Sequence, residues 1–215
     1  MRSDESALRL RPLFWRVRGE RSEGVLNLVD ETDAAWVHRV APHMDEVLVD
    51  HAHCEKKAAG AAVKLLFSYP HHRFIQGPLA QLAREELTHF EQILAVLDQR
   101  GITYRSLPPS PYGGKLHAEV RGDEPERVLD VMLVSALIEA RSCERMRALS
   151  LHLPDRELAD LYGGLLAEEA RHHGVYLSLA RQLADPEIVR TRFAELAQVE
   201  SRILRAEAPF PRLHT

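Results

Sequence analysis

The sequence contains little cysteine, few aromatic residues and no strong excess of charge of either sign. Two cysteines in 215 residues argue against a disulfide scaffold and against a cysteine-based zinc site. Aromatic residues make up 6% of the chain, and Ala and Leu dominate its apolar share, which favours helices over a β-sandwich. The formal net charge is −4, so a nucleic-acid partner would need a local basic patch.

Long hydrophobic runs are also absent from the sequence. No apolar stretch approaches the ~20 residues that a membrane span needs. Charged residues interrupt the first 20 positions, which therefore lack the apolar core of a signal peptide. With 45% hydrophobic and 28% charged residues, the composition is that of a globular protein. We expect a cytoplasmic protein with no membrane partner, as a monomer or a small homo-oligomer.

Apolar residues recur every three or four positions over four long stretches, which is typical of helices with one buried face. The predicted core helices span residues 43–69, 77–100, 124–151 and 155–184. A further helix is expected over residues 187–205. The segment between the second and third core helices is rich in Pro and Gly and is long enough for a crossover between two helix pairs. The pattern predicts an all-α four-helix bundle with short flanking helices.

The expected domain organisation is simple. Residues 32–206 form one helical domain, preceded by an irregular, Arg-rich arm over residues 1–31 and followed by a tail over residues 207–215. A short amphipathic piece near residues 33–40 opens the domain. The length of the chain suits one large domain better than two.

Polar residues interrupt each apolar stripe near its middle. Each of the four core helices carries one carboxylate there, and two of the helices carry a histidine three positions later. The residues are Glu55, Glu86, His89, Glu139, Glu169 and His172. Buried carboxylates are costly unless they are paired or bind a cation, and four of them with two imidazoles suit iron or manganese. This is the ligand set of ferritin-like di-metal carboxylate bundles.

The spacing of these residues repeats between the two halves of the sequence. The pair Glu86 and His89 in the first half recurs as Glu169 and His172 in the second half. The two lone glutamates, Glu55 and Glu139, are separated by almost the same distance along the sequence as Glu86 and Glu169, with a difference of one position. One E-x-x-H motif is expected by chance in such a chain. Two such motifs at matching positions on the apolar stripes of two helices predict a two-fold di-metal site. No catalytic residue beyond the six ligands is predicted.

The ligand from the third core helix has an alternative. Glu144 stands in a local sequence, Cys-Glu-Arg, that resembles the Cys-Glu-Lys around Glu55. The separation between Glu139 and Glu169 differs by only one position from the separation between Glu55 and Glu86. Glu139 therefore keeps the spacing of the first helix pair. The spacing therefore favours Glu139, with Glu144 left open.

Several phrases of the sequence together resemble the MiaE family of tRNA hydroxylases. They are HCEKKAAGAA, EELTHFEQIL, IEARSCER, EEARHHGVYLSLARQL and the crossover RGITYRSLPPSPYGGKLHAEVR. The resemblance extends from about residue 25 to residue 183. It implies a ferritin-like di-iron monooxygenase that hydroxylates the isopentenyl group of 2-methylthio-isopentenyl-adenosine next to the anticodon of tRNA. Matched by position, the resemblance implies that the six residues named above are the metal ligands.

The resemblance also implies cofactors and partners. Two Fe ions would act with O₂ as co-substrate, and the electrons would come from an external reductase or ferredoxin. With 24 Arg and four Lys, the chain is suited to bidentate phosphate contacts. The arginines that we expect to contact tRNA are Arg16 and Arg18 in the arm and Arg141, Arg145 and Arg147 on the third core helix.

Other functions share the predicted metal site. A ferroxidase, a peroxidase or a catalase on the same fold would not act on tRNA. A metal-free helical interaction protein is the alternative from a different class. Metal analysis and spectroscopy of iron-loaded protein exposed to O₂ distinguish these possibilities.

Overall fold

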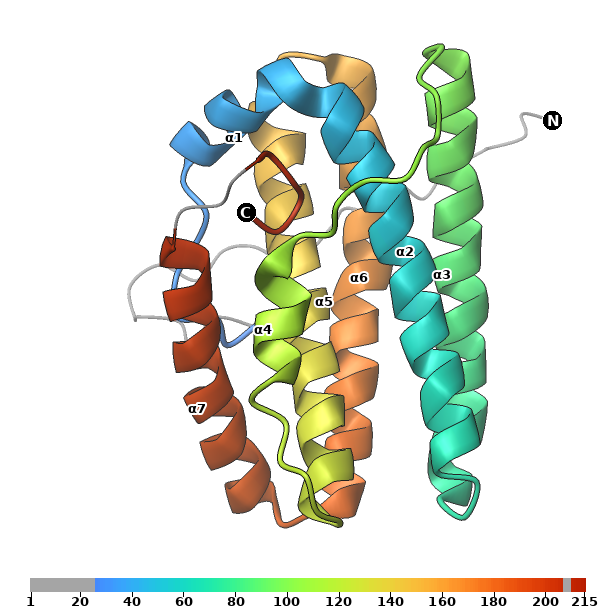
Figure 1. Ribbon diagram of the computed structural model, residues 1–215, viewed down its shortest axis with the longest axis vertical. Helices are drawn as coiled ribbons and strands as arrows, with labels where there is room; N and C mark the ends of the chain where they lie inside the picture. Colours follow the sequence, from blue (N-terminus) through green and yellow to red (C-terminus); the bar gives the residue numbers. More distant parts are fainter. Residues whose placement is uncertain (1–25, 207–209) are drawn as a thin grey trace, which may run out of the picture.

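The computed structural model describes residues 26–206 and 210–215, and this part of the chain is helical without strands. Four long helices form a bundle: α2 (Met44–Ser68), α3 (Arg73–Gln99), α5 (Glu126–His152) and α6 (Arg156–Leu183). Figure 1 shows α2 running antiparallel to α3, and α5 antiparallel to α6. The two pairs pack against each other, which confirms the predicted ferritin-like four-helix bundle.

The second core helix begins earlier than predicted. α3 starts at Arg73, so Pro78 lies inside the helix rather than in its first turn. A proline removes one backbone hydrogen bond and disfavours the helix interior. Here the additional turn places Ile75 in the core, where it is fully buried, and this burial favours the longer helix. The bounds of α2, α5 and α6 lie within two residues of the prediction.

The apolar core is divided into two clusters along the bundle axis. On α2, Leu48 and Ala52 belong to one cluster, while Ala62 and Leu65 belong to the other. Glu55 lies between them in the sequence of the helix. The division leaves a polar layer across the middle of the bundle.

The crossover carries a short helix that the sequence did not predict. α4 (Pro111–His117) contains Gly113 and Gly114, which argued for an irregular loop. The Ser110 side chain caps its first turn by accepting a hydrogen bond from the Tyr112 backbone N–H at 3.2 Å. Tyr112 and Leu116 are buried beneath it. Figure 1 shows the crossover passing in front of α2 before α4 lies over α5.

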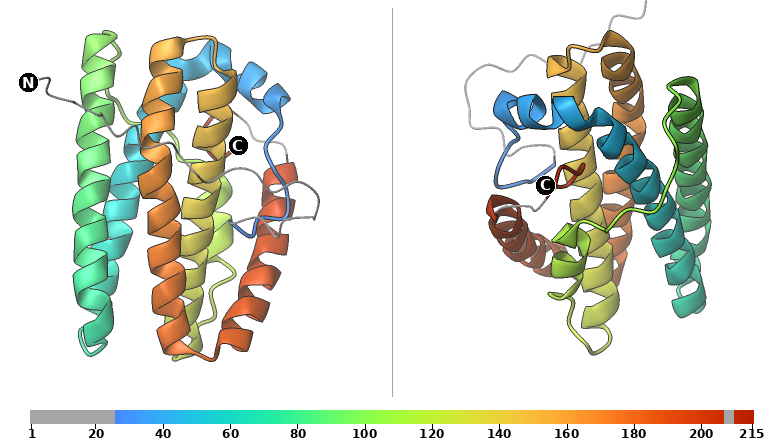
Figure 2. Two further views of the ribbon diagram at one scale, coloured as in Figure 1. Left: turned by 180° about the vertical axis from the view of Figure 1, so that it is seen from behind. Right: turned by 45° about the horizontal axis from the view of Figure 1, so that its top comes forward.

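Three further segments surround the bundle. α1 (Ala34–Val40) precedes α2, with a single 3₁₀ turn, Ala41–His43, between them. α7 (Pro186–Arg205) packs along α5 (Figure 2). Residues 210–215 return towards α1 and α2, where Leu213 joins the core. Within the described residues, no helix combines the length and apolar character needed to cross a membrane.

Candidate metal centre

The six predicted ligands lie together in the polar layer of the bundle. Each core helix contributes to the cluster: Glu55 from α2, Glu86 and His89 from α3, Glu139 from α5, and Glu169 and His172 from α6. All six side chains are buried. In Glu86, His89, Glu169 and His172, one potential ligand atom from each residue lies within 4.8 Å of the other three.

The two E-x-x-H pairs face each other across the helix pairs. Nδ1 of His172 on α6 lies 2.7 Å from Oε1 of Glu86 on α3. Nδ1 of His89 on α3 lies 3.2 Å from Oε1 of Glu169 on α6. Each histidine therefore points its Nδ1 towards the glutamate of the other half of the sequence. Glu55 lies on the same side of the cluster as His89, with 3.4 Å between its Oε2 and Nδ1 of that histidine.

Several atoms in this cluster are buried and approach one another closely, but they form no hydrogen bond of acceptable geometry within the described residues. They are Oε2 of Glu55, Oε1 of Glu86, Oε1 of Glu169 and Nδ1 of both His89 and His172. Unpaired buried polar atoms are rare and costly in proteins. A set of them that converges from three helices is a donor set of oxygen and imidazole nitrogen, which fits divalent iron or manganese. The residues thus offer a donor set that fits a bound metal cation.

The electrostatics of the cluster support the same conclusion. Burial raises the pKa of Glu86 and that of Glu139 well above the ordinary value, and the neighbouring carboxylates add to the shift. Burial also raises the pKa of Glu169. Burial opposes the charged form of Glu55 as well, but the imidazoles of His51 and His89 outweigh it and lower the pKa of this carboxyl. Without cations, the four carboxylates cannot all be ionised in one buried layer.

The outer nitrogen of each histidine is held by a further glutamate. Nε2 of His89 lies 2.8 Å from Oε2 of Glu168, and Nε2 of His172 lies 3.0 Å from Oε2 of Glu85. Glu85 is in turn paired with Arg171 at 2.7 Å. An acceptor on the outer nitrogen fixes the imidazole tautomer and leaves the other nitrogen for a metal.

The structure distinguishes the two candidates on α5. Glu139 is buried, and the carboxylates that raise its pKa are Glu169 and Glu55. Glu144 lies outside the cluster: its Oε1 accepts the backbone N–H of Thr32, and its Oε2 accepts Nη1–H of Arg141 at 2.9 Å. The spacing between the two halves therefore predicts the α5 residue of the cluster better than the local sequence around Glu144 does.

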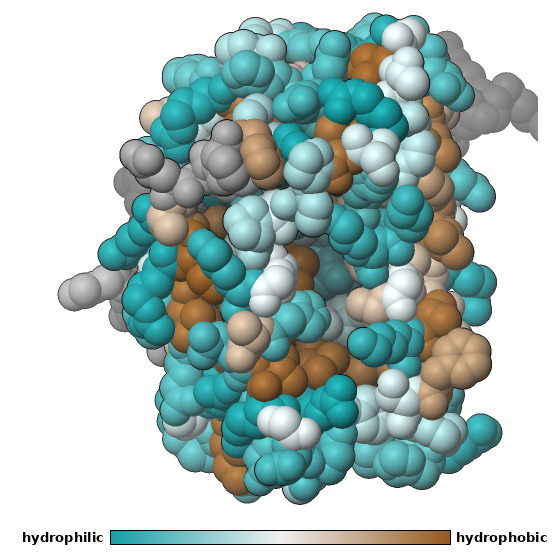
Figure 3. All heavy atoms as spheres, viewed as in Figure 1, coloured by the Kyte–Doolittle hydropathy of each residue, from teal (hydrophilic) through white to brown (hydrophobic). Residues whose placement is uncertain are grey.

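A cavity of about 520 Å³ leads to the cluster and is lined by four of its carboxylates, Glu55, Glu86, Glu139 and Glu169. Small and apolar residues contribute part of its wall, among them Ala58, Ala61 and Ile138. The crossover and α4 cover it from Pro109 to Gly114. Figure 3 shows this face of the molecule hollowed near its centre, with apolar side chains beside the hollow.

Two of the arginines that we expected to contact tRNA lie inside the protein. Arg141 is 1% exposed and donates to both carboxylate oxygens of Glu200, at 2.7 and 3.0 Å. Arg145 is 5% exposed and stacks over the Trp36 ring at 4.0 Å. Both predictions are therefore corrected, because these guanidinium groups bind other parts of the chain. Arg147 is exposed on α5, while Arg16 and Arg18 lie outside the described residues.

Other residues near the cluster were not predicted to belong to the site. His51 is fully buried, with its Nε2 2.6 Å from Oε1 of Glu55, and its ring stacks on Tyr162 at 5.5 Å. Tyr112 and His214 line the cavity although they come from the crossover and the tail. The position of His51 on the helix, four residues before Glu55, was a usable signal; the sequence has no comparable signal for His214.

Comparison with known proteins gives a consistent result. The model of the MiaE family, described as tRNA-(MS[2]IO[6]A)-hydroxylase, matches residues 22–215. A tRNA 2-(methylsulfanyl)-N(6)-isopentenyladenosine(37) hydroxylase from Pseudomonas putida is 38% identical over 201 residues, which cover 86% of this chain and 98% of the relative. The protein of the same description from Salmonella typhimurium is 31% identical over 230 residues, covering 84% of each chain.

A solved structure shares the fold. It is described as protein 43 with aldehyde deformylating oxygenase activity, from Synechococcus. It is 46% identical to this chain, with a TM-score of 0.85, and the match covers 87% of this chain and 95% of that one.

Proposed function

The chain belongs to the MiaE family of tRNA hydroxylases, and from this premise we propose that it hydroxylates the isopentenyl group of 2-methylthio-isopentenyl-adenosine next to the anticodon of tRNA. The observation that carries the proposal is the buried Glu and His cluster at the inner end of a cavity large enough for a modified base. The relatives from Pseudomonas putida and Salmonella typhimurium are described by this activity.

We propose that the six clustered residues, Glu55, Glu86, His89, Glu139, Glu169 and His172, hold two iron ions. When bound, the iron pair would supply the activation of O₂ that insertion of oxygen into an unreactive C–H bond requires. Glu85 and Glu168 hold the outer nitrogens of the two histidines, so that Nδ1 of each remains directed into the cluster.

The remaining residues of the cavity bind the substrate and keep water away from it. Ala58, Ala61 and Ile138 form an apolar surface beside the carboxylates, which suits a branched hydrocarbon group such as isopentenyl. The crossover and α4 cover the cavity and limit the access of solvent. The adenine ring lies further from the cluster, so the base must be unstacked from the anticodon loop, as bases read by proteins in single-stranded RNA generally are.

Hydroxylation consumes one O₂, two electrons and two protons, and it releases one water with each alcohol formed. The two electrons come from a separate reductase or ferredoxin, because neither a flavin motif nor a cysteine cluster is found in the sequence. The reaction takes place in the cytoplasm, where tRNA is modified.

Aldehyde deformylation is a second candidate function. One observation favours it: the solved structure described by that activity is 46% identical to this chain, against 38% for the relative from Pseudomonas putida. We place it second, because two relatives described as tRNA hydroxylases and the family model agree over most of the chain.

Nucleoside mass spectrometry tests the proposal directly. The iron-loaded protein is incubated with reductant, O₂ and tRNA that carries the prenylated adenosine, and in parallel with a long-chain aldehyde. We expect a mass increase of one oxygen atom on the prenylated adenosine. Conversion of the aldehyde without any change in the tRNA would replace hydroxylation by the second candidate.

A further inference from the structure

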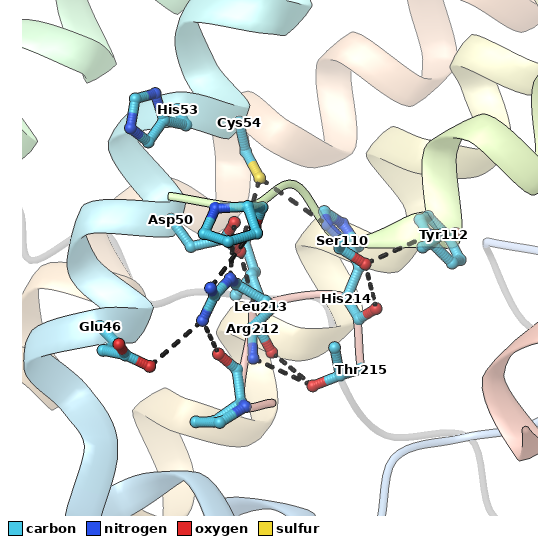
Figure 4. Close-up of polar contacts among 12 residues, drawn as sticks. Glu46, Asp50, His53, Cys54, Ser110, Tyr112, Arg212, Leu213, His214 and Thr215 are labelled. Carbon is cyan, nitrogen blue, oxygen red and sulfur yellow. Dashed lines mark hydrogen bonds and ion pairs between the residues drawn. The ribbon is translucent and has the colours of Figure 1, made fainter. Parts of the chain in front are cut away.

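The last residues of the sequence are bound against the wall of the cavity. The backbone N–H of Leu213 donates to Oδ2 of Asp50 on α2 at 3.0 Å. The side chain of Arg212 reaches the same carboxylate, with 3.7 Å between its Nε and Oδ1. Leu213 is fully buried in the core cluster that contains Leu48 and Ala52. Figure 4 shows Arg212 and Leu213 lying beside Asp50.

A second set of contacts holds this segment from the other side. Nε1–H of Trp36 on α1 donates to the backbone oxygen of Thr215 at 2.6 Å. Ser110, just before α4, donates its hydroxyl to the backbone oxygen of His214 at 3.2 Å. We call residues 212–215 the strap, since contacts to α1, α2 and the crossover hold it in place.

His214 is the residue of the strap that faces the cavity. Its ring stacks on Tyr112, with 4.8 Å between ring centroids and 5° between the planes. Its Nε2 lies 3.0 Å from the Ser142 hydroxyl on α5, and its Nδ1 lies 3.9 Å from Sγ of Cys54 on α2. His214 lines the same cavity as Glu55 and Glu139. The ring thus bridges three elements on the cavity wall.

We propose that the strap completes the wall of the substrate cavity and that His214 is a specificity-determining residue, whose ring holds the modified adenosine in register with the carboxylate cluster. The inference rests on the proposed function, because it assigns the cavity to the prenylated base. Aromatic rings are the usual partners of unstacked bases, and Tyr112 keeps this ring from turning. Truncation of the ring would enlarge the cavity at that point and leave the base loosely held.

Binding measured without turnover tests this role. Iron-loaded protein is titrated with the nucleoside N6-isopentenyladenosine in the absence of O₂, and the Kd is compared among variants of matched thermal stability. We expect His214→Ala to raise the Kd about tenfold. His214→Phe keeps a ring stacked on Tyr112 and should stay within about threefold of the wild type. His38→Ala, on the exposed face of α1 and away from the cavity, is the matched control and should leave the Kd unchanged.

The contribution of the strap is tested from outside the cavity. Trp36→Phe removes the Nε1–H donor to Thr215 while keeping an aromatic ring under Arg145. Trp36 does not line the cavity, so this substitution changes no direct contact to the ligand and removes a hydrogen bond to the strap. We expect about a threefold rise in Kd for this variant. In turnover with tRNA, His214→Ala should raise KM about tenfold and change kcat by less than threefold.

The possible results separate the two proposals. If the wild-type protein binds the nucleoside and His214→Ala binds it equally well, the strap has no part in recognition and the inference is overturned. If His214→Phe is as weak as His214→Ala, the ring is not the group that matters, and the inference is again overturned. If the wild-type protein binds no prenylated nucleoside and hydroxylates no tRNA, the proposed function itself fails.

Discussion

Oε2 of Glu168 on α6 lies 2.8 Å from Nε2 of His89 on α3. The hydrogen-bond acceptor for this histidine, which belongs to the first half of the sequence, therefore comes from the second half. Glu85 and His172 repeat the relationship in the opposite direction, at 3.0 Å. Each glutamate immediately precedes one of the clustered glutamates, Glu86 or Glu169. The sequence Glu-Glu-x-x-His therefore supplies a clustered carboxylate, a clustered imidazole and an acceptor for the opposite imidazole.

This arrangement predicts the effect of substitutions at the two outer glutamates. Glu85→Ala and Glu168→Ala should each weaken ferrous binding by about 10-fold to 100-fold, the range found when such outer contacts are removed. The effect of Glu85→Ala should be the larger, because Arg171 fixes Glu85 while Glu168 is 49% exposed. Calorimetric titration of each variant with ferrous salt measures both affinities.

Glu91→Ala is the control for this comparison. Glu91 is exposed on α3, close in sequence to His89. Equal metal affinities for Glu85→Ala, Glu168→Ala and Glu91→Ala would show that the crossed hydrogen bonds do not position the histidines.

A buried ion pair between α5 and α7 should stabilise the fold without contacting tRNA. Arg141→Met removes the positively charged partner of Glu200, which is fully buried and, among the described residues, keeps only the hydrogen bond from the Tyr112 hydroxyl. Breaking a buried pair from one side costs about 3–5 kcal/mol, because a charge is left without compensation. We expect a loss of this size in the free energy of unfolding, measured by urea denaturation.

Arg147→Ala is the matched variant on the same helix. Arg147 is exposed, and the contacts of an exposed arginine usually contribute about 1 kcal/mol or less to stability, which is well below the loss expected at Arg141. If Arg141→Met were as stable as Arg147→Ala but bound tRNA more weakly, Arg141 would have a role in tRNA contact rather than in stability.

The pH dependence of stability should show the contribution of Asp130. Burial opposes ionisation of this carboxyl, but hydrogen bonds from Arg121 and Arg192 outweigh it and lower its pKa to about 2. Because the folded-state pKa is below the unfolded value, the stabilisation is complete above about pH 4. It is lost as the pH falls from there towards 2.

Asp130→Asn removes this stabilisation at all pH values. We expect wild type and variant to differ by on the order of 2 kcal/mol in the free energy of unfolding at pH 6, a typical value for hydrogen bonds to a charged group. The difference should shrink below pH 4. A difference that stays constant from pH 6 to pH 3 would contradict the lowered pKa.

Removing the hydroxyl of Tyr162 tests how a buried group without a hydrogen bond affects thermal stability. This hydroxyl is buried and has no hydrogen-bond partner within the described residues. Since a buried, unsatisfied donor is costly, Tyr162→Phe should leave the thermal midpoint unchanged or raise it. A clear drop in the thermal midpoint would mean that the hydroxyl has a partner, such as an ordered water.

The sequence predicted the parts of this structure that depend on local pattern. The four core helices follow from apolar residues at helical spacing, and the six clustered residues stand out because carboxylates such as Glu55 and Glu139 occupy positions on apolar stripes. Both features depend on residues that lie within a few positions of each other on one helix face. The matching separations of the two halves then indicated that two similar helix pairs contribute to one shared site.

The sequence did not predict contacts between distant segments. Arg141 looked like a surface cation, but its partner Glu200 lies 59 residues further along the chain. α4 was hidden by Gly113 and Gly114, because the burial of Tyr112 that stabilises it depends on α5 and α7. The position of His214 in the cavity wall depends on contacts to α1, α2, α4 and α5, none of which leaves a pattern near residue 214.

We propose that six side chains from two matching halves of the chain hold two metal ions. Anomalous scattering from crystals grown with ferrous salt, recorded on both sides of the iron absorption edge, would locate these ions. Two iron peaks per chain are predicted, enclosed by Glu55, Glu86, His89, Glu139, Glu169 and His172, and both should disappear in Glu86→Ala crystals grown in the same way. Wild-type crystals without iron between these side chains would show that the cluster is not a metal centre.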